Sequence, residues 1–156
     1  NDVSDFSIEL DMKTGILRRQ FTVFGVQFIV TKFLSVAQKE LAVIRWDMVA
    51  VDGKTHQVRL DSLVDADVKN EDSNYEEKFW EVLAKEHENA RSSIATRTVA
   101  NPFGVDQFIV NAEQRFSGSL KDNPIAVFAP QSGLTNYLDW QATHHATYQG
   151  YCLQYV

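Results

Sequence analysis

The acidic segment from Asp65 to Glu76 holds the side chains best suited to binding a metal ion. Four carboxylates fall near the first, third, seventh and twelfth positions of a calcium-binding loop: Asp65, Asp67, Glu71 and Glu76. Two residues oppose this interpretation, because Lys69 stands where an oxygen ligand is usual and Asn70 replaces the glycine that allows the sharp turn. We therefore expect a hydrated loop here and no metal site.

The histidines and the cysteine offer no combined site. His144 and His145 are neighbours, and neighbouring side chains of a strand point to opposite faces, so the two cannot easily share one ion. His56 is isolated in an expected strand, and His87 lies near the end of an expected helix, where its charge would complement the backbone dipole. Cys152 is the only cysteine, which excludes an intramolecular disulfide and fits a reducing, cytoplasmic compartment.

The chain lacks the short motifs that mark nucleophilic or phosphate-binding chemistry. It contains no Gly-x-Ser-x-Gly, no Gly-x-Gly-x-x-Gly and no complete Walker motif. Its 21 acidic residues allow so many carboxylate pairs that spacing selects none of them for glycoside hydrolysis. We expect no catalytic residue and no cofactor-binding residue in this chain.

Aromatic side chains could stack on sugar rings, but core packing explains most of them. Trp46 shares one side of an expected strand with Met48, which places it in the core. Phe79 and Trp80 are adjacent and cannot both lie on the narrow buried stripe of a helix, so we expect Trp80 to contact another domain. Trp80, Phe79 and Tyr75 are therefore the candidate docking residues.

Alternation of apolar and polar residues predicts antiparallel strands along most of the chain. Turns are expected at Gly15, at Gly25 and at Asp52-Gly53, a dipeptide favoured in type I′ hairpins, so residues 57–63 should return alongside residues 41–51. Weaker strand patterns occupy the last third. The stronger patterns predict strands over residues 6–12, 17–23, 26–33, 41–51, 57–63, 94–99, 107–116 and 125–129.

One segment has a helical pattern. Ser73 and Glu76 match a capping box, and four apolar residues follow at helical spacing: Tyr75, Phe79, Val82 and Leu83. We place a short helix near residues 74–87. About ten strands against one helix predict an all-β fold, a two-sheet antiparallel β-sandwich with one short helix, and the absence of an interior linker predicts a single domain over residues 1–156.

Charge and hydropathy limit the partners. Fifteen Lys and Arg residues stand against 21 Asp and Glu residues, and the net charge of −6 repels phosphate backbones, so we expect no nucleic-acid partner. No apolar run approaches the roughly 18 residues of a membrane span, so we expect no membrane contact. The chain begins at Asn1 without a leader and enters a strand pattern at once, so we expect an excised fragment of a larger enzyme.

The segment LDMKTGILRR, residues 10–19, resembles a stretch typical of the N-terminal domain of glycoside hydrolase family 65. The resemblance continues in KFLS at residues 32–35 and IRW at residues 44–46, and weakens after DVKN at residues 67–70. It implies a β-sandwich of the supersandwich type, which agrees with the fold predicted from alternation. The stretch from Tyr75 to Asn89 and the tail from His144 match no motif of the family.

The resemblance also implies a parent activity. The family includes maltose, kojibiose and trehalose phosphorylases and related hydrolases, whose general-acid glutamate and phosphate pocket lie in a separate helical barrel. A parent of this kind would cleave an α-glucosidic disaccharide such as maltose with inversion, using inorganic phosphate as co-substrate and no cofactor. The sandwich would be a non-catalytic support that packs on the barrel of the same chain, meets the disaccharide only indirectly and helps to form a homodimer.

Two other functions remain open at the level of sequence. A free-standing carbohydrate-binding module would display an exposed aromatic platform and bind sugars measurably. An interaction sandwich unrelated to sugars is equally compatible with the composition, and only the family-like segment favours the carbohydrate enzyme over it.

Overall fold

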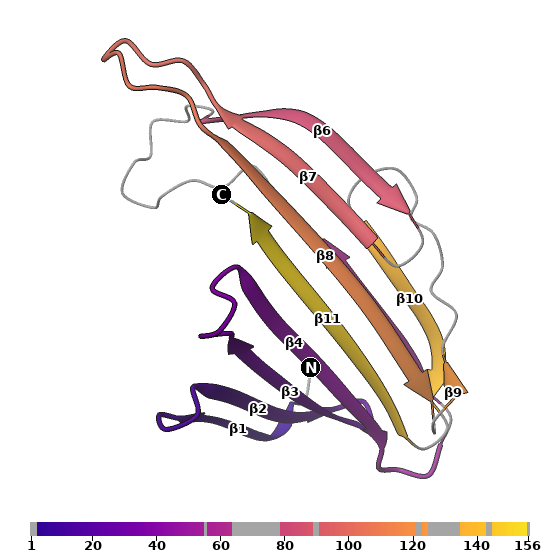
Figure 1. Cartoon of the computed structure of the whole chain (residues 1–156). Helices are drawn as coiled ribbons and strands as arrows, with labels where there is room; N and C mark the ends of the chain where they lie inside the picture. The colour runs from indigo at the N-terminus through magenta and orange to yellow at the C-terminus, as the bar shows by residue number, and fades with distance from the viewer. Residues whose placement is uncertain are drawn as a thin grey trace.

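The computed structural model describes residues 3–54, 56–63, 79–88, 91–120, 123–124, 135–142 and 145–155. Every regular element within these residues is a β-strand (Figure 1). The strands are β1 Ser4–Asp11, β2 Ile16–Val23, β3 Val26–Leu34, β4 Leu41–Ala50, β5 His56–Leu63, β6 Trp80–Glu88, β7 Arg91–Thr98, β8 Ile109–Leu120, β9 Asn123–Pro124, β10 Thr135–Ala142 and β11 His145–Tyr155.

The described strands form two antiparallel sheets. In the large sheet the neighbours run β1-β2-β3-β4-β11-β8-β7-β6, with β9 paired to β8, and β5 and β10 pair in the second sheet. Figure 1 shows the large sheet as one long curved layer that extends from β1 to β6. Contacts between β10 and β4 join the two sheets. The predicted fold class, an all-β two-sheet antiparallel β-sandwich, is confirmed.

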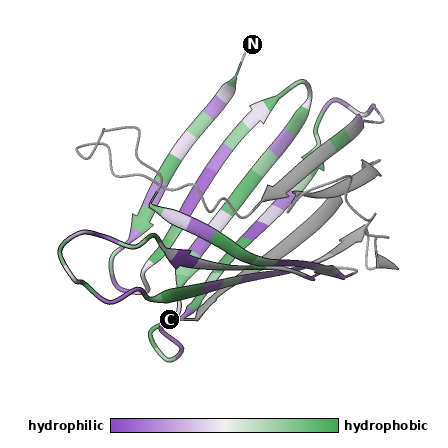
Figure 2. Ribbon diagram, turned by 90° about the horizontal axis from the view of Figure 1, so that it is seen from above, coloured by the Kyte–Doolittle hydropathy of each residue, from purple (hydrophilic) through white to green (hydrophobic). Residues whose placement is uncertain are grey.

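The core lies on one face of the large sheet. Four alternating side chains of β3 and β4 are at most 8% exposed: Val26, Phe28, Val30 and Met48. They share a face because side chains two residues apart in a strand point the same way, and Figure 2 shows the alternation as green and purple bands along the strands. The Phe28 ring stacks on Phe21 at 5.1 Å between centroids and meets Trp46 edge-on at 6.2 Å, so Trp46 joins this core as predicted, although it is only half-buried.

The turn between β2 and β3 requires a glycine. Phe24 and Gly25 have φ angles of 49° and 78°, the pair of positive values that defines a type I′ turn. A side chain on Gly25 would collide with the carboxylate of Asp52, which is fixed by the Lys54 N–H at 3.0 Å and by His56 Nε2 at 2.7 Å. Backbone conformation and lack of space therefore both select glycine here.

The expected hairpin between residues 41–51 and 57–63 is wrong. Gly53 has a φ of 72°, but Asp52 does not have a positive φ, so the dipeptide does not form a type I′ turn. β4 pairs with β3 and with β11, whereas β5 pairs with β10 in the other sheet. The physical reason is that β11 fills the space between β4 and β8 and satisfies the backbone groups along both strands.

The short helix expected near residues 74–87 is also wrong for its described part. Residues 80–88 form β6, which pairs with β7 from Trp80 opposite Thr98 to Glu88 opposite Arg91. The register shifts between Val82 and Ala84, the mark of a β-bulge. The bulge places Leu83 outside the period of two, directly after Val82, so the apolar residues of this strand do not alternate regularly. Without a helix there, His87 has no helix dipole to complement.

The apolar face of the sheet continues past the core onto the edge strand β1. Ile8 lies opposite Arg19, and Arg19 lies opposite Val30 of the core, so Ile8 is on the core side. Phe6, Ile8 and Leu10 are nevertheless 53–61% exposed. β2 is the only strand neighbour of β1 in the described part of the chain. An apolar stripe on an open sheet edge is thus available for contact with further polypeptide.

Replacing Gly25 by alanine should destabilise the domain more than replacing Gly53. Both glycines have positive φ angles, so each variant loses roughly 1–2 kcal/mol of unfolding free energy from backbone strain. Only at Gly25 does the new methyl group collide with the Asp52 carboxylate, which must move and weaken its hydrogen bonds with Lys54 and His56 at a further cost of about 1 kcal/mol, while nothing lies within 4 Å at Gly53. Urea denaturation of Gly25→Ala and Gly53→Ala measures the difference, and equal losses would contradict the steric explanation.

Candidate functional site

Two of the three predicted docking residues lie at one end of the strands β6 and β7. Phe79 and Trp80 are half-buried where β6 begins, and the Phe79 carbonyl accepts a hydrogen bond from the Val99 N–H at 2.9 Å. The Trp80 ring meets the Phe108 ring edge-on, with 5.6 Å between centroids. Tyr75 lies outside the described residues. The structure thus brings Phe79 and Trp80 to the base of the connection between β7 and β8.

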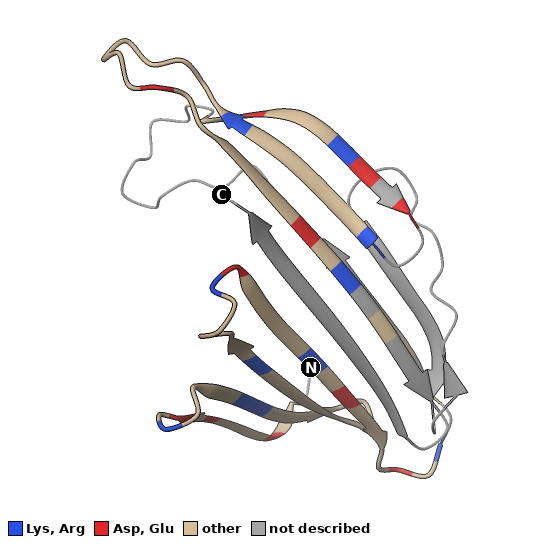
Figure 3. Cartoon of the chain, viewed as in Figure 1, with Lys and Arg blue, Asp and Glu red and all other residues tan. Residues whose placement is uncertain are grey.

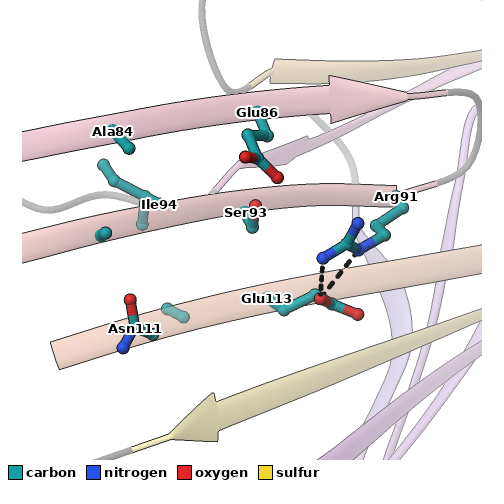
Figure 4. A pocket seen from close by; sticks show the side chains of 9 residues that line it. Ala84, Glu86, Arg91, Ser93, Ile94, Asn111 and Glu113 are labelled. Carbon is teal, nitrogen blue, oxygen red and sulfur yellow. Dashed lines mark hydrogen bonds and ion pairs between the residues drawn. The ribbon is translucent and has the colours of Figure 1, made fainter.

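A hollow of about 350 Å³ lies elsewhere on the same three strands, β6, β7 and β8 (Figure 4). Small side chains contribute to its lining, which leaves the space open. Directly paired residues share a face across the strands, as Glu86, Ser93 and Glu113 do here. The hollow is lined by Ala84, Glu86, Arg91, Ser93, Ile94, Ala95, Asn111, Ala112 and Glu113.

The carboxylate of Glu113 is held between two arginines. Its Oε2 accepts hydrogen bonds from Arg91 Nε at 2.8 Å and Arg91 Nη2 at 2.7 Å, and its Oε1 accepts one from Arg115 Nε at 2.6 Å. The Glu113 side chain is only 10% exposed, so these charge-assisted hydrogen bonds are well shielded from water. They come from β7 on one side and from β8 itself on the other.

These contacts set the protonation of Glu113. The hydrogen bond from Arg91 lowers the pKa of Glu113, burial raises it, and the hydrogen bond from Arg115 lowers it further, so the pKa stays below its ordinary value. Glu113 in turn raises the pKa of Arg91. A general acid in glycoside cleavage needs a raised pKa so that it carries a proton to deliver. Glu113 is therefore a structural carboxylate and is unsuited to acid catalysis.

Further ion pairs follow the same charged face. Arg97 Nη2 lies 2.8 Å from Glu81 Oε2 between β7 and β6, and Arg45 Nη2 lies 2.8 Å from Asp47 Oδ1 within β4. Figure 3 shows residues of both signs along β6, β7 and β8. On these strands Arg91, Arg97 and Arg115 each lie within 2.8 Å of a carboxylate oxygen, so their positive charges are compensated locally.

The structure describes no candidate metal centre. Within its described residues, no three His, Cys, Asp or Glu side chains come together as an ion would require. His56 instead contacts Asp52 at 2.7 Å, and this hydrogen bond, together with the Lys54 N–H, keeps the pKa of Asp52 below its ordinary value. The acidic segment from Asp65 to Glu76 and His144 lie outside the described residues.

The described part of the chain contains no helix that is long and apolar enough to cross a membrane.

The geometry defines the chain as a two-sheet antiparallel β-sandwich domain whose buried carboxylate is structural. Its sequence matches the family described as "Glycosyl hydrolase family 65, N-terminal domain" over residues 1–147. The chain therefore belongs to glycosyl hydrolase family 65, as the segment LDMKTGILRR indicated.

Two relatives illustrate the match. The chain is 39% identical to the maltose phosphorylase of Bacillus subtilis (strain 168) over 116 residues, which are 72% of this chain and 15% of the relative. A solved structure named "Putative kojibiose phosphorylase from human microbiome" superposes with a TM-score of 0.72 at 16% identity, covering 99% of this chain and 19% of that one. The second likeness supports the fold alone, and the chain spans less than a fifth of either relative.

Sequence reasoning missed the Glu113 cluster. Glu113 and Arg115 are two residues apart in a strand, and this spacing already puts an acid and a base on one face. Arg91 lies 22 residues earlier in the chain and reaches Glu113 only because β7 pairs with β8 in a particular register. The spacing of Glu113 and Arg115 could therefore have indicated an ion pair, but the contact with Arg91 could not be predicted without the pairing of β7 and β8.

Replacing Glu113 by glutamine should cost roughly 1–3 kcal/mol of unfolding free energy at pH 7, because two arginines lose a buried charged acceptor. The matched control is Glu81→Gln, whose ion pair with Arg97 is half-exposed on both sides and should be worth less than about 1 kcal/mol. Urea denaturation of both variants gives the comparison, and an equal effect of the two substitutions would show that burial of Glu113 does not matter.

The cost of Glu113→Gln should also depend on pH. Because folding lowers the pKa of Glu113, its charge stabilises the folded state fully above the unfolded pKa of about 4.3. That contribution disappears as the pH falls through the folded pKa. The difference in unfolding free energy between the natural chain and Glu113→Gln should therefore be constant from pH 7 to pH 5.5 and shrink below about pH 4.3. A difference that grew in acid would contradict the lowered pKa.

Proposed function

We propose that this chain is a non-catalytic support domain of an inverting glycoside phosphorylase or hydrolase that acts on an α-glucosidic disaccharide such as maltose. The match to the family 65 N-terminal domain over residues 1–147 carries the proposal. The relative that shares 39% identity is named a maltose phosphorylase, which favours maltose as the substrate of the parent enzyme. In this proposal residues 1–156 act as a single domain.

The chemistry of inversion explains why the proposal places catalysis outside the sandwich. One carboxylic acid must protonate the leaving oxygen while phosphate or water attacks the opposite face of the sugar. Glu113 is the most deeply buried carboxylate described in this chain, and its two arginine partners keep it ionised. The acid and the pocket for inorganic phosphate would thus lie in the remaining polypeptide, and the sandwich needs no cofactor of its own.

In this proposal the sandwich packs against the remaining polypeptide of the parent enzyme. Phe6, Ile8 and Leu10 expose apolar surface on β1, which supports a contact with further chain. Phe79, Trp80 and Tyr75 remain proposed docking residues toward the helical catalytic barrel, and a homodimer of the parent is compatible with the same role. We place the parent in the cytoplasm, with neither nucleic acid nor membrane among its partners.

The isolated 156-residue chain should neither hydrolyse nor phosphorolyse maltose or kojibiose. Coupled assays that detect glucose and glucose 1-phosphate measure both reactions, and turnover by a pure sample would end the proposal. Calorimetry with maltose and glucose tests the carbohydrate-binding module as the alternative. A support domain should give no heat of binding at millimolar sugar, whereas a saturable heat would favour the module.

A further inference from the structure

The connection between β7 and β8, residues 99–108, carries an exposed apolar tip. This β7–β8 loop extends past the end of the large sheet (Figure 1). Phe103 is 87% exposed and Val105 is 64% exposed. No charged residue occurs from Val99 to Val105, and Figure 3 shows the loop uncharged except at Asp106. Water surrounds this apolar tip unless another surface covers it.

A single side chain holds the tip in one conformation. Asn101 Nδ2 donates a hydrogen bond to the Val105 carbonyl at 2.9 Å. Asn101 Oδ1 accepts hydrogen bonds from the N–H groups of Phe103 at 2.9 Å and Val105 at 3.2 Å. Gly104 supplies the positive φ of 72° that the turn requires. These hydrogen bonds hold the loop in a closed conformation, which lowers the part of the entropy cost of binding that comes from ordering the loop.

Hydrogen bonds also hold the base of the loop at the end of the sheet. The Thr98 N–H donates to the Phe108 carbonyl at 3.1 Å, and Thr98 Oγ1 accepts from the Phe108 N–H at 3.1 Å. Gln107 Nε2 donates to the Thr98 carbonyl. The Phe108 ring then meets Trp80 of β6. Trp80 therefore contacts the base of the loop, while Phe103 lies exposed at its tip.

The size of the tip limits what can cover it. A stable complex of separate proteins buries roughly 800 Å² on each partner, whereas one aromatic side chain buries only about 150–250 Å². A second copy meeting the loop tip to tip would therefore be held too weakly. A partner on the same polypeptide meets the loop at a local concentration on the order of millimolar, where a small contact suffices. The two relatives are long enough to supply such a partner, since this chain spans 15% and 19% of them.

We infer that the β7–β8 loop is a preformed docking element, and that Phe103 and Val105 insert into an apolar groove on the part of the parent polypeptide that follows this domain. The inference rests on the proposed function in one respect, since it requires that this chain be the support domain of a longer family 65 protein. It does not depend on which disaccharide that protein cleaves.

Photo-cross-linking in the full-length parent protein tests the contact directly. A benzoylphenylalanine in place of Phe103 should give, after irradiation, a product of monomer mass whose linked peptide comes from beyond residue 156. The matched control carries the same group in place of Phe24, another exposed aromatic residue at a turn, and should give no such product. A cross-link from position 103 to a second copy, or no cross-link, would overturn the inference.

Substitution provides an independent measurement on the full-length protein. Phe103→Ser should speed the proteolytic separation of this domain from the rest of the chain at least tenfold, and Phe103→Leu should retain the natural rate within about twofold. Phe24→Asn is the control for a lost exposed ring, and asparagine accepts the positive φ of that position. Equal rates for Phe103→Ser and Phe24→Asn would refute docking through the loop.

The two proposals fail in different experiments. If full-length protein with maltose phosphorylase activity shows no cross-link from position 103, docking through the loop is wrong and the support role stands. If the cross-link forms but the full-length protein acts on no α-glucosidic disaccharide, the loop inference stands and the proposed function is wrong.

Discussion

A sheet of this width stays folded only if one of its faces is removed from water, and the alternating side chains of β3 and β4 begin that removal. Phe28 lies at the centre of the contacts, stacked on Phe21 and met edge-on by Trp46. Each of these rings comes from a different strand, so the cluster fixes the register of β2, β3 and β4 relative to one another. The tight turn at Gly25 then follows from the register, because Val23 must pair with Val26.

In the described part of β7 and β8, buried polar side chains stand beside the apolar ones. On β7 the buried side chains include Ser92 and Thr96 beside Ile94, and Thr96 donates its hydroxyl to the Val110 carbonyl at 3.2 Å. On the opposite face, Glu113 is satisfied by two arginines. Buried polar groups of this kind tolerate little displacement, because an unpaired one costs more than the pair contributes. Polar contacts therefore help to hold the strands β6 to β8 in register.

These contacts connect the fold to the proposed role. Strands that are held in register position the β7–β8 loop at its base, and the Asn101 hydrogen bonds close its tip independently. The same arrangement argues against chemistry on this face, since a carboxylate with both oxygens occupied by arginines can neither donate a proton nor attack a sugar. In the proposed function, the support role and the absence of a general acid on this face would thus share one physical origin.

The sequence by itself determined the fold class and the family, because period-two alternation is local and because the segment at residues 10–19 is distinctive. It failed where distant pairing decided the outcome. β5 is not part of the large sheet because β11 pairs with the free edge of β4. Residues 80–87 were predicted to be helical because a bulge at Leu83 interrupts the alternation of β6. The positions of Arg91 beside Glu113 and of Trp80 beside Phe108 were likewise decided by tertiary structure, since they depend on how β6, β7 and β8 pair with one another and not on the pattern of any one strand.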